Sequence, residues 1–504
     1  MKHLARPLIA LVTAAALTLT GCSAGSGGGE ASSTGSGFSQ PIRIGALFAP
    51  TDTLDPATVT SPGGTATAFY LYDSLAMMAK DGATLSLAKS IEPNATADEW
   101  TVTLRDGLVY SDGTAATGQD VIDSLAHLAQ APSFAPLYSN VDFAASTAEG
   151  STATLKLKQP ASDFLDSSLA MLSTIAPKGS FTGVGAGPYV LEQGDPSTGY
   201  QLRANDKYWD GAPEIPQVTF VPIPDSGAQA NALKTGEIDV ASGLNSAALA
   251  SLSGTENITI PEATLESAVA MELTLNTRVA PFDDPEVRRA AKLTLDRDKM
   301  VTTLLGSSGE VANDMLGMGY ATYPADVAQT TADKAEAQRI FADKGITSFT
   351  IIAADTAPGL VASAELMVQE FAEVGVQVSV DKRDPQTFFT NMAELYQAPA
   401  FTMYWINRTP SNEFRSQIAP DSPYNVSGYA SDTLASNFTA LTTTLDQAEQ
   451  QRLVGEISRE VHDQGGDLVW GYQKQIQAHH MGLAGVTSFQ SIPWLAKATF
   501  TPAS

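Results

Sequence analysis

SFTIIA at residues 348–353 opens the stretch that decides the fold of this chain. Its nearly unbroken apolar run predicts a buried strand. Apolar residues then recur at three- and four-residue steps through 361–374, which predicts an amphipathic helix. Gly375 follows as the expected C-terminal cap, and VQVSV at 376–380 predicts a second strand. The stretch therefore indicates a strand–helix–strand unit.

A further helix and strand follow directly. Pro385 begins a helical pattern that continues to Met392, and AFTMYW at 400–405 predicts a third strand. Alternation of strands and helices over about sixty residues indicates a mostly parallel sheet with covering helices. Much earlier, residues 100–104 and 154–157 predict strands of the antiparallel type, joined by polar turns. The chain is therefore of the α/β class, with some antiparallel sheet in its first third.

The composition excludes several classes of protein. A chain of 504 residues is long enough for two or three domains. It has 29 Lys and Arg against 55 Asp and Glu, and the net charge of −26 repels nucleic acid. One cysteine excludes an internal disulfide, a thiolate zinc site and an iron–sulfur cluster. The sequence contains no G-x-S-x-G, H-E-x-x-H or P-loop motif, so we do not expect an enzyme.

The N-terminus has the layout of a secretory signal. A short basic start precedes an apolar run at 8–19, and residues 19–22 read LTGC. The run is too short to span a bilayer as a helix, which needs about 20 residues. This ending resembles a bacterial lipobox, which implies cleavage of a signal peptide at 1–21 and acylation of Cys22. The alternative is an ordinary signal peptide that contains a cysteine. Residues 22–39, rich in Ser and Gly, predict a flexible linker.

Motifs spread over residues 54–297 occur in the order known from one protein family. They are Leu54-Asp55-Pro56, YDSL at 72–75, WTVTLRDG at 100–107, YSDGT at 110–114, Asp120-Val121, GAGPY at 185–189, NDKYW at 205–209, GEID at 236–239, LNT at 275–277, PFDDP at 281–285, VRRA at 287–290 and LDR at 295–297. With them the chain resembles the family 5 solute-binding lipoproteins, which are the dipeptide, oligopeptide and nickel-chelate receptors of ABC importers.

The resemblance implies a periplasmic-binding-protein-like fold of type II, in the large peptide-receptor variant with an extra insert subdomain. Two lobes would close on the ligand around a hinge. The expected parts are lobe I at 40–80, 180–270 and 479–504, an insert of lobe I at 81–179, and lobe II at 271–478. The chain would cross between the lobes near Met271–Asn276 and near Gln477–Gly482.

The ligand site is expected where strand 400–405 ends, because ligands of open α/β sheets bind beyond the carboxyl ends of strands. Trp405 can stack on a polar solute, and Asn407 and Arg408 can form hydrogen bonds with it. The alternative places Trp405 in the core and Arg408 on the surface. Asn276, Thr65 and Tyr429 complete the predicted ligand-binding set.

The same loop resembles the Trp-x-x-Asp segment of peptide receptors, in which the aspartate pairs with the terminal ammonium of the peptide. Trp405 matches the tryptophan, but Arg408 stands at the aspartate position. An ammonium about 4 Å from Arg408 would meet a repulsion of about 4 kcal/mol at an effective dielectric near 20. Either Glu413 or another acid then binds the amine, or the ligand offers a carboxylate or another anion.

Other conspicuous residues have structural interpretations. Asp112 is typical of a turn and Asp120 of a helix start. Arg288 and Arg289 are expected on a solvated helix face near acids. The neighbours His479 and His480 point to opposite faces of a strand, which disfavours a shared metal ion. Tyr208 and Trp209 are expected to pack.

We therefore expect a lipid-anchored, monomeric receptor on the extracytoplasmic face of the cell membrane. It would capture a peptide or similar polar solute and deliver it to ABC permease and ATPase subunits, without a catalytic residue, metal ligand or cofactor. One alternative is a receptor for an anionic, nickel-type metal chelate, because few histidines oblige a metal to arrive with its own ligands. A secreted hydrolase is a weaker alternative, since no nucleophile–base pair is found.

Overall fold

The computed structural model describes residues 41–501, apart from 386, 420–421, 423 and 490–491. Phe38–Ser504 form one compact unit, to which the described residues belong. The predicted signal peptide, Cys22 and the linker at 22–39 lie outside the described residues. In the part of the chain that is described, no helix combines the length and the apolar character needed to cross a membrane.

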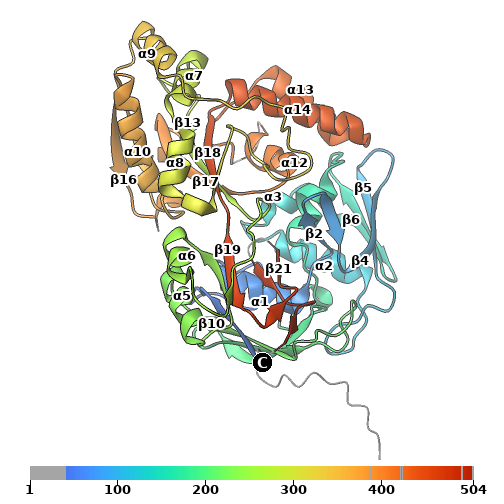
Figure 1. Ribbon diagram of the computed structural model, residues 1–504. Coiled ribbons are helices and arrows are strands. Elements are labelled where there is room, and N and C mark those ends of the chain that lie inside the picture. The colour runs from blue at the N-terminus through green and yellow to red at the C-terminus, as the bar shows by residue number, and fades with distance from the viewer. Residues whose placement is uncertain (1–40, 386, 420–421, 423, 490–491, 502–504) are drawn as a thin grey trace, which may run out of the picture. The chain divides into compact units, whose positions relative to one another are not determined.

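A seven-stranded sheet is centred on β1 (Ile42–Ala46), where Ile42 and Ile44 are buried. β1 pairs in parallel with β10 (Gln217–Pro222) and β11 (Val240–Leu244). The strand order is β12-β19-β11-β1-β10-β9-β8, with the outer strands at Ile258–Thr259 (β12), Ile476–His480 (β19), Gly199–Ala204 (β9) and Tyr189–Asp195 (β8). Figure 1 shows α5 (Ser226–Thr235) and α6 (Ser246–Leu252) beside this sheet.

A four-stranded antiparallel sheet has the order β4-β5-β7-β6. Its strands are β4 (Ala88–Pro93), β5 (Glu99–Leu104), β7 (Thr152–Leu157) and β6 (Val141–Glu149). The pairing of β5 with β7 confirms the two antiparallel strands predicted at 100–104 and 154–157. Helix α2 (Gly118–Leu128) begins with a capping box between Thr117 and Asp120, which confirms the helix-start role of Asp120.

The six-stranded sheet contains the three strands predicted near residues 348–353, 376–380 and 400–405. β15 (Ser348–Ala353) lies parallel to both β16 (Gln377–Lys382) and β17 (Ala400–Ile406), as predicted. The whole sheet, however, is mixed and not mostly parallel. β13 (Val269–Leu275) pairs antiparallel with β17 and with β18 (Asp467–Gln473), and β14 (Gly309–Val311) pairs antiparallel with β18. These partners come from distant parts of the chain, which local periodicity does not reveal.

Helix α10 (Leu360–Glu373) confirms the helix predicted over 361–374, and Gly375 has the positive φ of +82° that suits a C-terminal glycine. The predicted helix from Pro385 is shorter, a 3₁₀ turn at Phe388–Asn391 followed by α11 (Met392–Leu395). The other helices near this sheet are α7 (Pro285–Thr294), α8 (Arg297–Leu304), η3 (Gly306–Ser308), α9 (Lys334–Asp343), α12 (Pro410–Glu413), the π-helical η5 (Phe414–Ile418), α13 (Asp432–Thr443) and α14 (Gln447–Gln464).

The remaining elements complete the first half and the C-terminal end. They are α1 (Pro62–Tyr72), β2 (Ala76–Ala79), β3 (Gly82–Leu85), α3 (Ala135–Tyr138), η1 (Leu165–Leu169), α4 (Ala170–Leu172), η2 (Pro177–Gly179), β20 (Leu483–Ala484), β21 (Thr487–Phe489), β22 (Ile492–Trp494) and β23 (Thr499–Phe500). Tyr70 of α1 packs against Tyr189, Phe220 and Trp494 with ring centroids 5.1–5.3 Å away. This contact joins α1, the seven-stranded sheet and the C-terminal strands in one core.

Within residues 41–501, apart from the gaps given above, the chain passes between the two large sheets twice. The first connection is 260–268, between β12 and β13, and the second is 474–475, between β18 and β19. Figure 1 shows the direct continuation of β18 into β19. Both connections precede the crossings predicted near Met271–Asn276 and Gln477–Gly482, because β13 lies wholly in one sheet and β19 in the other. The lobe boundaries themselves stay a prediction.

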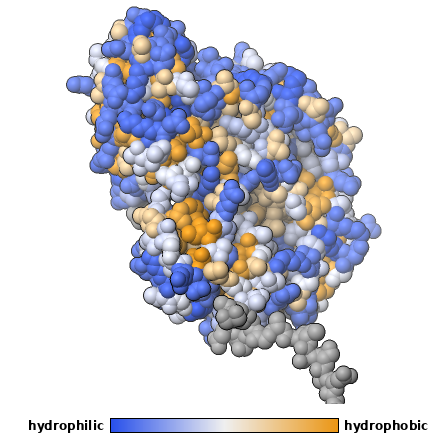
Figure 2. Space-filling view, viewed as in Figure 1, coloured by the Kyte–Doolittle hydropathy of each residue, from blue (hydrophilic) through white to orange (hydrophobic). Residues whose placement is uncertain are grey.

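Apolar side chains form one buried core against the seven-stranded sheet and another against the six-stranded sheet, as expected for an α/β fold. Figure 2 shows mainly hydrophilic side chains on the face in view, with hydrophobic side chains in separate patches. The π-helical turn η5 and the long irregular segment after β14 interrupt this regular architecture near the end of β17. The predicted ligand loop lies there.

Candidate functional site

Trp405 is held at the end of β17 by a buried acid. It lies opposite Ala270 on β13, and Glu272 follows two residues later on the same face of that strand. This diagonal relation lets the Trp405 Nε1 donate a hydrogen bond to Glu272 Oε2 at 2.7 Å. Glu272 is fully buried, and burial, aided by Asp467, raises the pKa of its carboxyl. The indole is therefore half-buried and fixed by one edge.

The Asn407 side chain joins its own loop to two other segments of backbone. Its Nδ2 donates to the carbonyls of Leu265 and Met318, each at 2.7 Å, and its Oδ1 accepts from Gly317 N at 3.2 Å. The side chain is 2% exposed, so these backbone partners use its amide. Gly317 has a φ of +89°, and a Cβ there would lie 2.6 Å from the Pro410 ring. Glycine is therefore required where this segment meets the loop after β17.

The segment that carries Gly317, residues 312–333, has no regular secondary structure. Its start is fixed by Arg297 of α8, whose Nη2 donates to both carboxylate oxygens of Asp314 at 2.8 and 2.7 Å. The two side chains are 2% and 0% exposed. Such a buried ion pair fixes geometry, because loss of either partner would leave the other charge buried and alone.

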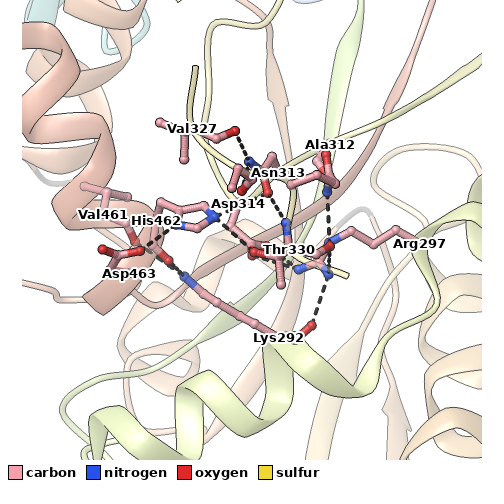
Figure 3. Close-up of polar contacts among 12 residues, drawn as sticks. Lys292, Arg297, Ala312, Asn313, Asp314, Val327, Thr330, Val461, His462 and Asp463 are labelled. Atoms are coloured by element: carbon pink, nitrogen blue, oxygen red, sulfur yellow. Dashed lines mark hydrogen bonds and ion pairs between the residues drawn. The ribbon is translucent and has the colours of Figure 1, made fainter. Parts of the chain in front are cut away.

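A second group of contacts fixes the same segment from the other side. Thr330 N donates to Asn313 Oδ1 at 2.8 Å, and the His462 ring meets Thr330 Oγ1 at 3.0 Å. Figure 3 shows these contacts beside the Arg297–Asp314 pair, with His462 reaching in from α14. The irregular segment is therefore anchored along its length, which makes it a rigid support for Asn407.

Arg408 is the cation of the predicted site, and the buried acid Glu413 accepts a hydrogen bond from its backbone. Its backbone N donates to Glu413 Oε1 at 2.9 Å, and Gln417 Nε2 donates to Glu413 Oε2. Burial raises the pKa of Glu413 to about 7, although the charge of Arg408 and these hydrogen bonds act against the rise. The Arg408 side chain forms no ion pair with any described residue, and its Nε is buried without a hydrogen-bond partner. Its charge is therefore only partly compensated near neutral pH.

The helical turns after Arg408 contact η1 and the residues directly before it. Asn412 Nδ2 donates to Ser167 O at 2.8 Å, and Arg415 donates from Nε to Asp163 Oδ2 at 3.0 Å. Ser162 adds contacts to the end of α13, with its N 2.8 Å from Thr442 O and its Oγ 2.7 Å from Leu441 O. These contacts, between 162–167 and 412–442, are called the latch below. The latch joins the predicted insert to the predicted second lobe.

The structure places Asn276 away from this loop. Asn276 follows β13, whose Leu275 pairs with Ala400, so it lies at the opposite end of β17, about 20 Å from Ile406 at about 3.3 Å per residue. Its amide donates to the carbonyls of Tyr396 and Ala398. The structure places Asn276 in a backbone contact, and its ligand role stays a prediction.

Tyr429 and Thr65 also have partners within the protein. Tyr429 donates from its hydroxyl to Glu460 Oε1 at 3.0 Å, and burial raises its pKa to about 12. It follows Ser427, whose carbonyl accepts from Thr277 N, which places it near the Asn276 end of the sheet. Thr65 lies on α1 and donates to Ser61 O at 3.0 Å. Their ligand roles stay predictions as well.

Among the residues given structural interpretations, Arg288 was predicted wrongly. It is 5% exposed and donates to the carbonyls of Phe282 and Gln464, because the end of α14 covers it. Arg289 pairs with Glu336 at 3.2 Å, which confirms the predicted solvated pair. Asp112 accepts from Thr114 N, which confirms its turn role.

The two adjacent histidines meet backbone carbonyls. His479 Nδ1 lies 3.0 Å from His480 O, and His480 Nε2 lies 3.0 Å from Leu233 O. Tyr208 and Trp209 pack as predicted, and both donate to Asp73 Oδ2. No group of three or more His, Cys, Asp or Glu side chains within the described ranges is arranged to hold a metal ion.

Sequence reasoning missed Glu272, Gly317 and the latch residues of 162–167. Glu272 had a local signal, since it is an acid inside the apolar strand VAMELTL. The other residues had none, because their roles depend on partners more than 90 positions away, such as Pro410 for Gly317. The arrangement as a whole presents a stacking ring and a cation on a rigid loop, with no nucleophile–base pair among the contacts described above. It suits binding of a polar solute.

Comparisons with known proteins agree with this chemistry. Residues 83–422 match the family described as "Bacterial extracellular solute-binding proteins, family 5 Middle". The glutathione-binding protein GsiB of Salmonella typhimurium is 24% identical over 470 residues, which cover 88% of this chain and 91% of that protein.

Solved structures share the fold. The ABC transporter substrate-binding protein CtaP from Listeria monocytogenes aligns with a TM-score of 0.79 at 21% identity, over 92% of this chain and 99% of that one. NikZ from Campylobacter jejuni, solved in complex with Ni(L-His), aligns with a TM-score of 0.73 at 19% identity, over 90% of this chain and 97% of that one. The fold is therefore the two-lobed, type II periplasmic-binding-protein-like architecture. With a family match over more than half of its length, this chain belongs to the bacterial extracellular solute-binding proteins of family 5.

Proposed function

We propose that this chain captures a peptide-sized polar solute that carries a carboxylate or another anionic group, and delivers it to an ABC permease. Its class is that of the ABC-importer solute-binding proteins, which are not enzymes. The finer proposal concerns the chemistry of the ligand. The observation that carries it is the partly compensated charge of Arg408.

Three features of Arg408 support an anionic ligand group. Its Nε is buried without a partner, and a buried donor left unpaired costs about 1–3 kcal/mol. Its side chain forms no ion pair with a described residue, whereas the adjacent Glu413 is partly neutral near pH 7. A carboxylate on the ligand would supply the missing charge, and a turn of the Arg408 side chain toward it would give Nε the missing acceptor. A ligand ammonium would supply neither.

The neighbouring residues support a ligand with flat or apolar groups as well. Trp405 is half-buried and fixed through Glu272, and Ile406 is 47% exposed beside it. Asn407 instead donates and accepts within the protein, so we propose that it holds the loop and does not contact the solute. The proposed contacts are therefore Trp405 and Arg408.

Glutathione is the first probe, because GsiB relatives are named as glutathione-binding proteins and glutathione is a tripeptide with two carboxylates. Calorimetric titration of the protein should show binding that weakens at least about 30-fold in Arg408→Ala, since loss of one partner of a desolvated pair costs about 2–5 kcal/mol. Arg408→Asp should bind more weakly still. Arg203→Ala, which removes an exposed arginine of β9, is the matched control and should bind like the wild type.

Nickel with histidine is the second probe and tests the chelate alternative. If Arg408→Ala binds glutathione or the chelate as tightly as the wild type, the argument for an anionic group at Arg408 fails. If the wild type binds neither probe, mass spectrometry of small molecules released on denaturation identifies the solute.

We also propose that the chain is an extracytoplasmic lipoprotein attached through Cys22, and that it acts as a monomer. The support is the apolar run and LTGC ending of the first 22 residues, together with the extracellular description of the family. Mass spectrometry of the mature N-terminus tests the anchor: a Cys22 without lipid would refute it.

A further inference from the structure

We propose that the chain has a second ligand site, away from the loop after β17, which binds a small molecule with two or more carboxylate or phosphate groups. The site is a hollow of about 450 Å³, called the basic hollow below. It is lined by Lys89, Arg105, Asp106, Gly107, Leu108, Lys207 and Trp209. This proposal goes beyond the capture of a solute at Arg408 and does not depend on it.

The basic hollow lies where two sheets meet. Lys89 belongs to β4, and Arg105 to Leu108 follow β5, so these residues come from the four-stranded sheet. Lys207 and Trp209 come from the loop between β9 and β10 of the seven-stranded sheet. Its volume lies within the range of about 300–1,000 Å³ that is typical of small-molecule sites. Both sheets therefore contribute cations to one concave surface.

Arg105 is a fixed cation in this hollow. Its Cζ lies 3.6 Å from the centroid of the Trp209 ring, and its Nε donates to Ser86 O. The indole is in turn fixed, because Trp209 Nε1 donates to the buried Asp73 at 3.3 Å. Stacking orients the guanidinium without neutralising it. No carboxylate of the described chain forms an ion pair with Arg105.

The two lysines also retain charge for a ligand. Lys207 Nζ donates to Ser111 O at 3.2 Å, and a carbonyl does not cancel its charge. The nearby Asp112 has a lowered pKa chiefly because Thr114 donates to it, with Lys207 a lesser cause. Lys89 pairs with Asp106 at 2.6 Å, but these side chains are 55% and 82% exposed, and such pairs contribute little. Lys89 can therefore turn to a ligand at small cost.

The charge of the whole chain makes this hollow unusual. With a net charge of −26, the protein repels anions over most of its surface. Among the described residues that line the basic hollow, three are cations and one, Asp106, is an acid. Cations from different directions favour a ligand with several anionic groups over a single carboxylate, because each group can meet its own donor. A dianion or polyanion is therefore the chemistry that this surface recognises.

The test is calorimetric titration of the full chain at low salt with inorganic pyrophosphate and with citrate. Saturable binding of either probe is expected, and Lys207→Gln combined with Lys89→Gln should weaken it at least about tenfold. Lys158→Gln is the matched control, because Lys158 Nζ also donates to one carbonyl, that of Ser139, at 2.7 Å. The control should bind like the wild type.

The two probes distinguish phosphate recognition from carboxylate recognition, and variants at the two sites distinguish the two proposals. Pyrophosphate alone indicates phosphates, citrate alone indicates carboxylates, and both support a general polyanion site. Arg408→Ala should leave this binding unchanged, and the double lysine variant should leave glutathione binding at Arg408 unchanged, so failure of one proposal is distinguishable from failure of the other. Absence of saturable binding, or equal loss in Lys158→Gln, would overturn the second site.

Discussion

Glu413 is a carboxylic acid that the fold keeps partly protonated near neutral pH. Burial raises its pKa to about 7, whereas an exposed glutamate titrates near about 4.3. Between these two values the folded chain holds a proton that the unfolded chain has released. The free energy of unfolding therefore falls as pH rises through this window. The contribution of Glu413 to stability is most favourable below about pH 4 and is lost above about pH 7.

Glu413→Gln should remove this dependence on pH. The amide keeps an acceptor for Arg408 N, and Gln417 can accept from it after a flip, because the Gln417 Oε1 has no partner. Between pH 5 and pH 8 the variant should gain stability relative to the wild type by up to about 3 kcal/mol, at 1.36 kcal/mol per unit of pKa. Urea unfolding at both pH values measures it, with Glu256→Gln, an exposed acid, as the control. Equal pH slopes in all three proteins would contradict the buried, raised-pKa assignment.

The loop after β17, together with the α12 turn that follows it, meets two distant parts of the chain. The connection before β13, the irregular segment after β14 and the start of α12 all meet there. Asn407 makes the first two of these contacts, and Gly317 makes the third by its approach to Pro410. The loop after β17 is therefore a junction, and its rigidity comes from the elements that surround it.

Asn407→Ala should destabilise this junction. The change leaves the carbonyls of Leu265 and Met318 and the Gly317 N without their buried partner, and each such group costs about 1–3 kcal/mol. We expect a loss of about 2–4 kcal/mol in urea unfolding, since water can replace part of the contacts. Asn231→Ala on α5, where the side chain is exposed, should change stability by less than about 0.5 kcal/mol. If Asn407→Ala unfolds in urea with the stability of the wild type, the three contacts are not maintained in solution.

The elements near this loop could be predicted from sequence to within about a residue or two, because their signals are local. Apolar runs predicted β15 and β17, and Gly375 marked the end of α10. The antiparallel neighbour β13 could not be predicted as a partner of β17, since more than a hundred residues separate them. The prediction that Arg288 is solvated was wrong for the same reason, because a carbonyl that it binds belongs to Gln464. A local sequence pattern can indicate a strand or a helix. The strand or side chain that pairs with it is known only from the fold.

At the scale of the whole molecule, polar contacts hold the predicted insert against the predicted second lobe. In the latch, Arg415 pairs with Asp163, and the side chains are 25% and 6% exposed. Asn412, two residues beyond Pro410, donates to Ser167 O. The latch therefore begins four residues after Arg408, on the helical turns that follow the proposed ligand loop. Occupation of that loop and closure of the latch are expected to support each other.

Asp163→Asn should weaken the latch and expand the unliganded protein. Loss of the carboxylate removes the bidentate pair with Arg415, so the radius of gyration from X-ray scattering should rise and then fall again when a bound solute restores closure. Asp239→Asn is the control, because Asp239 makes a similar pair with Arg43 inside the seven-stranded sheet. Identical scattering profiles for Asp163→Asn and the wild type would argue that the latch does not control closure.

The two connections between the large sheets differ in length, and this has a mechanical consequence. Residues 474–475 can span at most about 7 Å, whereas 260–268 could span about 30 Å if extended. Lys474 is also tied down, with its N 2.8 Å from Ser308 O and its Nζ 3.0 Å from Glu310. The short connection therefore limits the distance between the sheets and acts as a pivot. The long connection can extend without limiting their motion. We therefore expect the sheets to rotate about Lys474 when the protein opens, because the short connection keeps them together at that point.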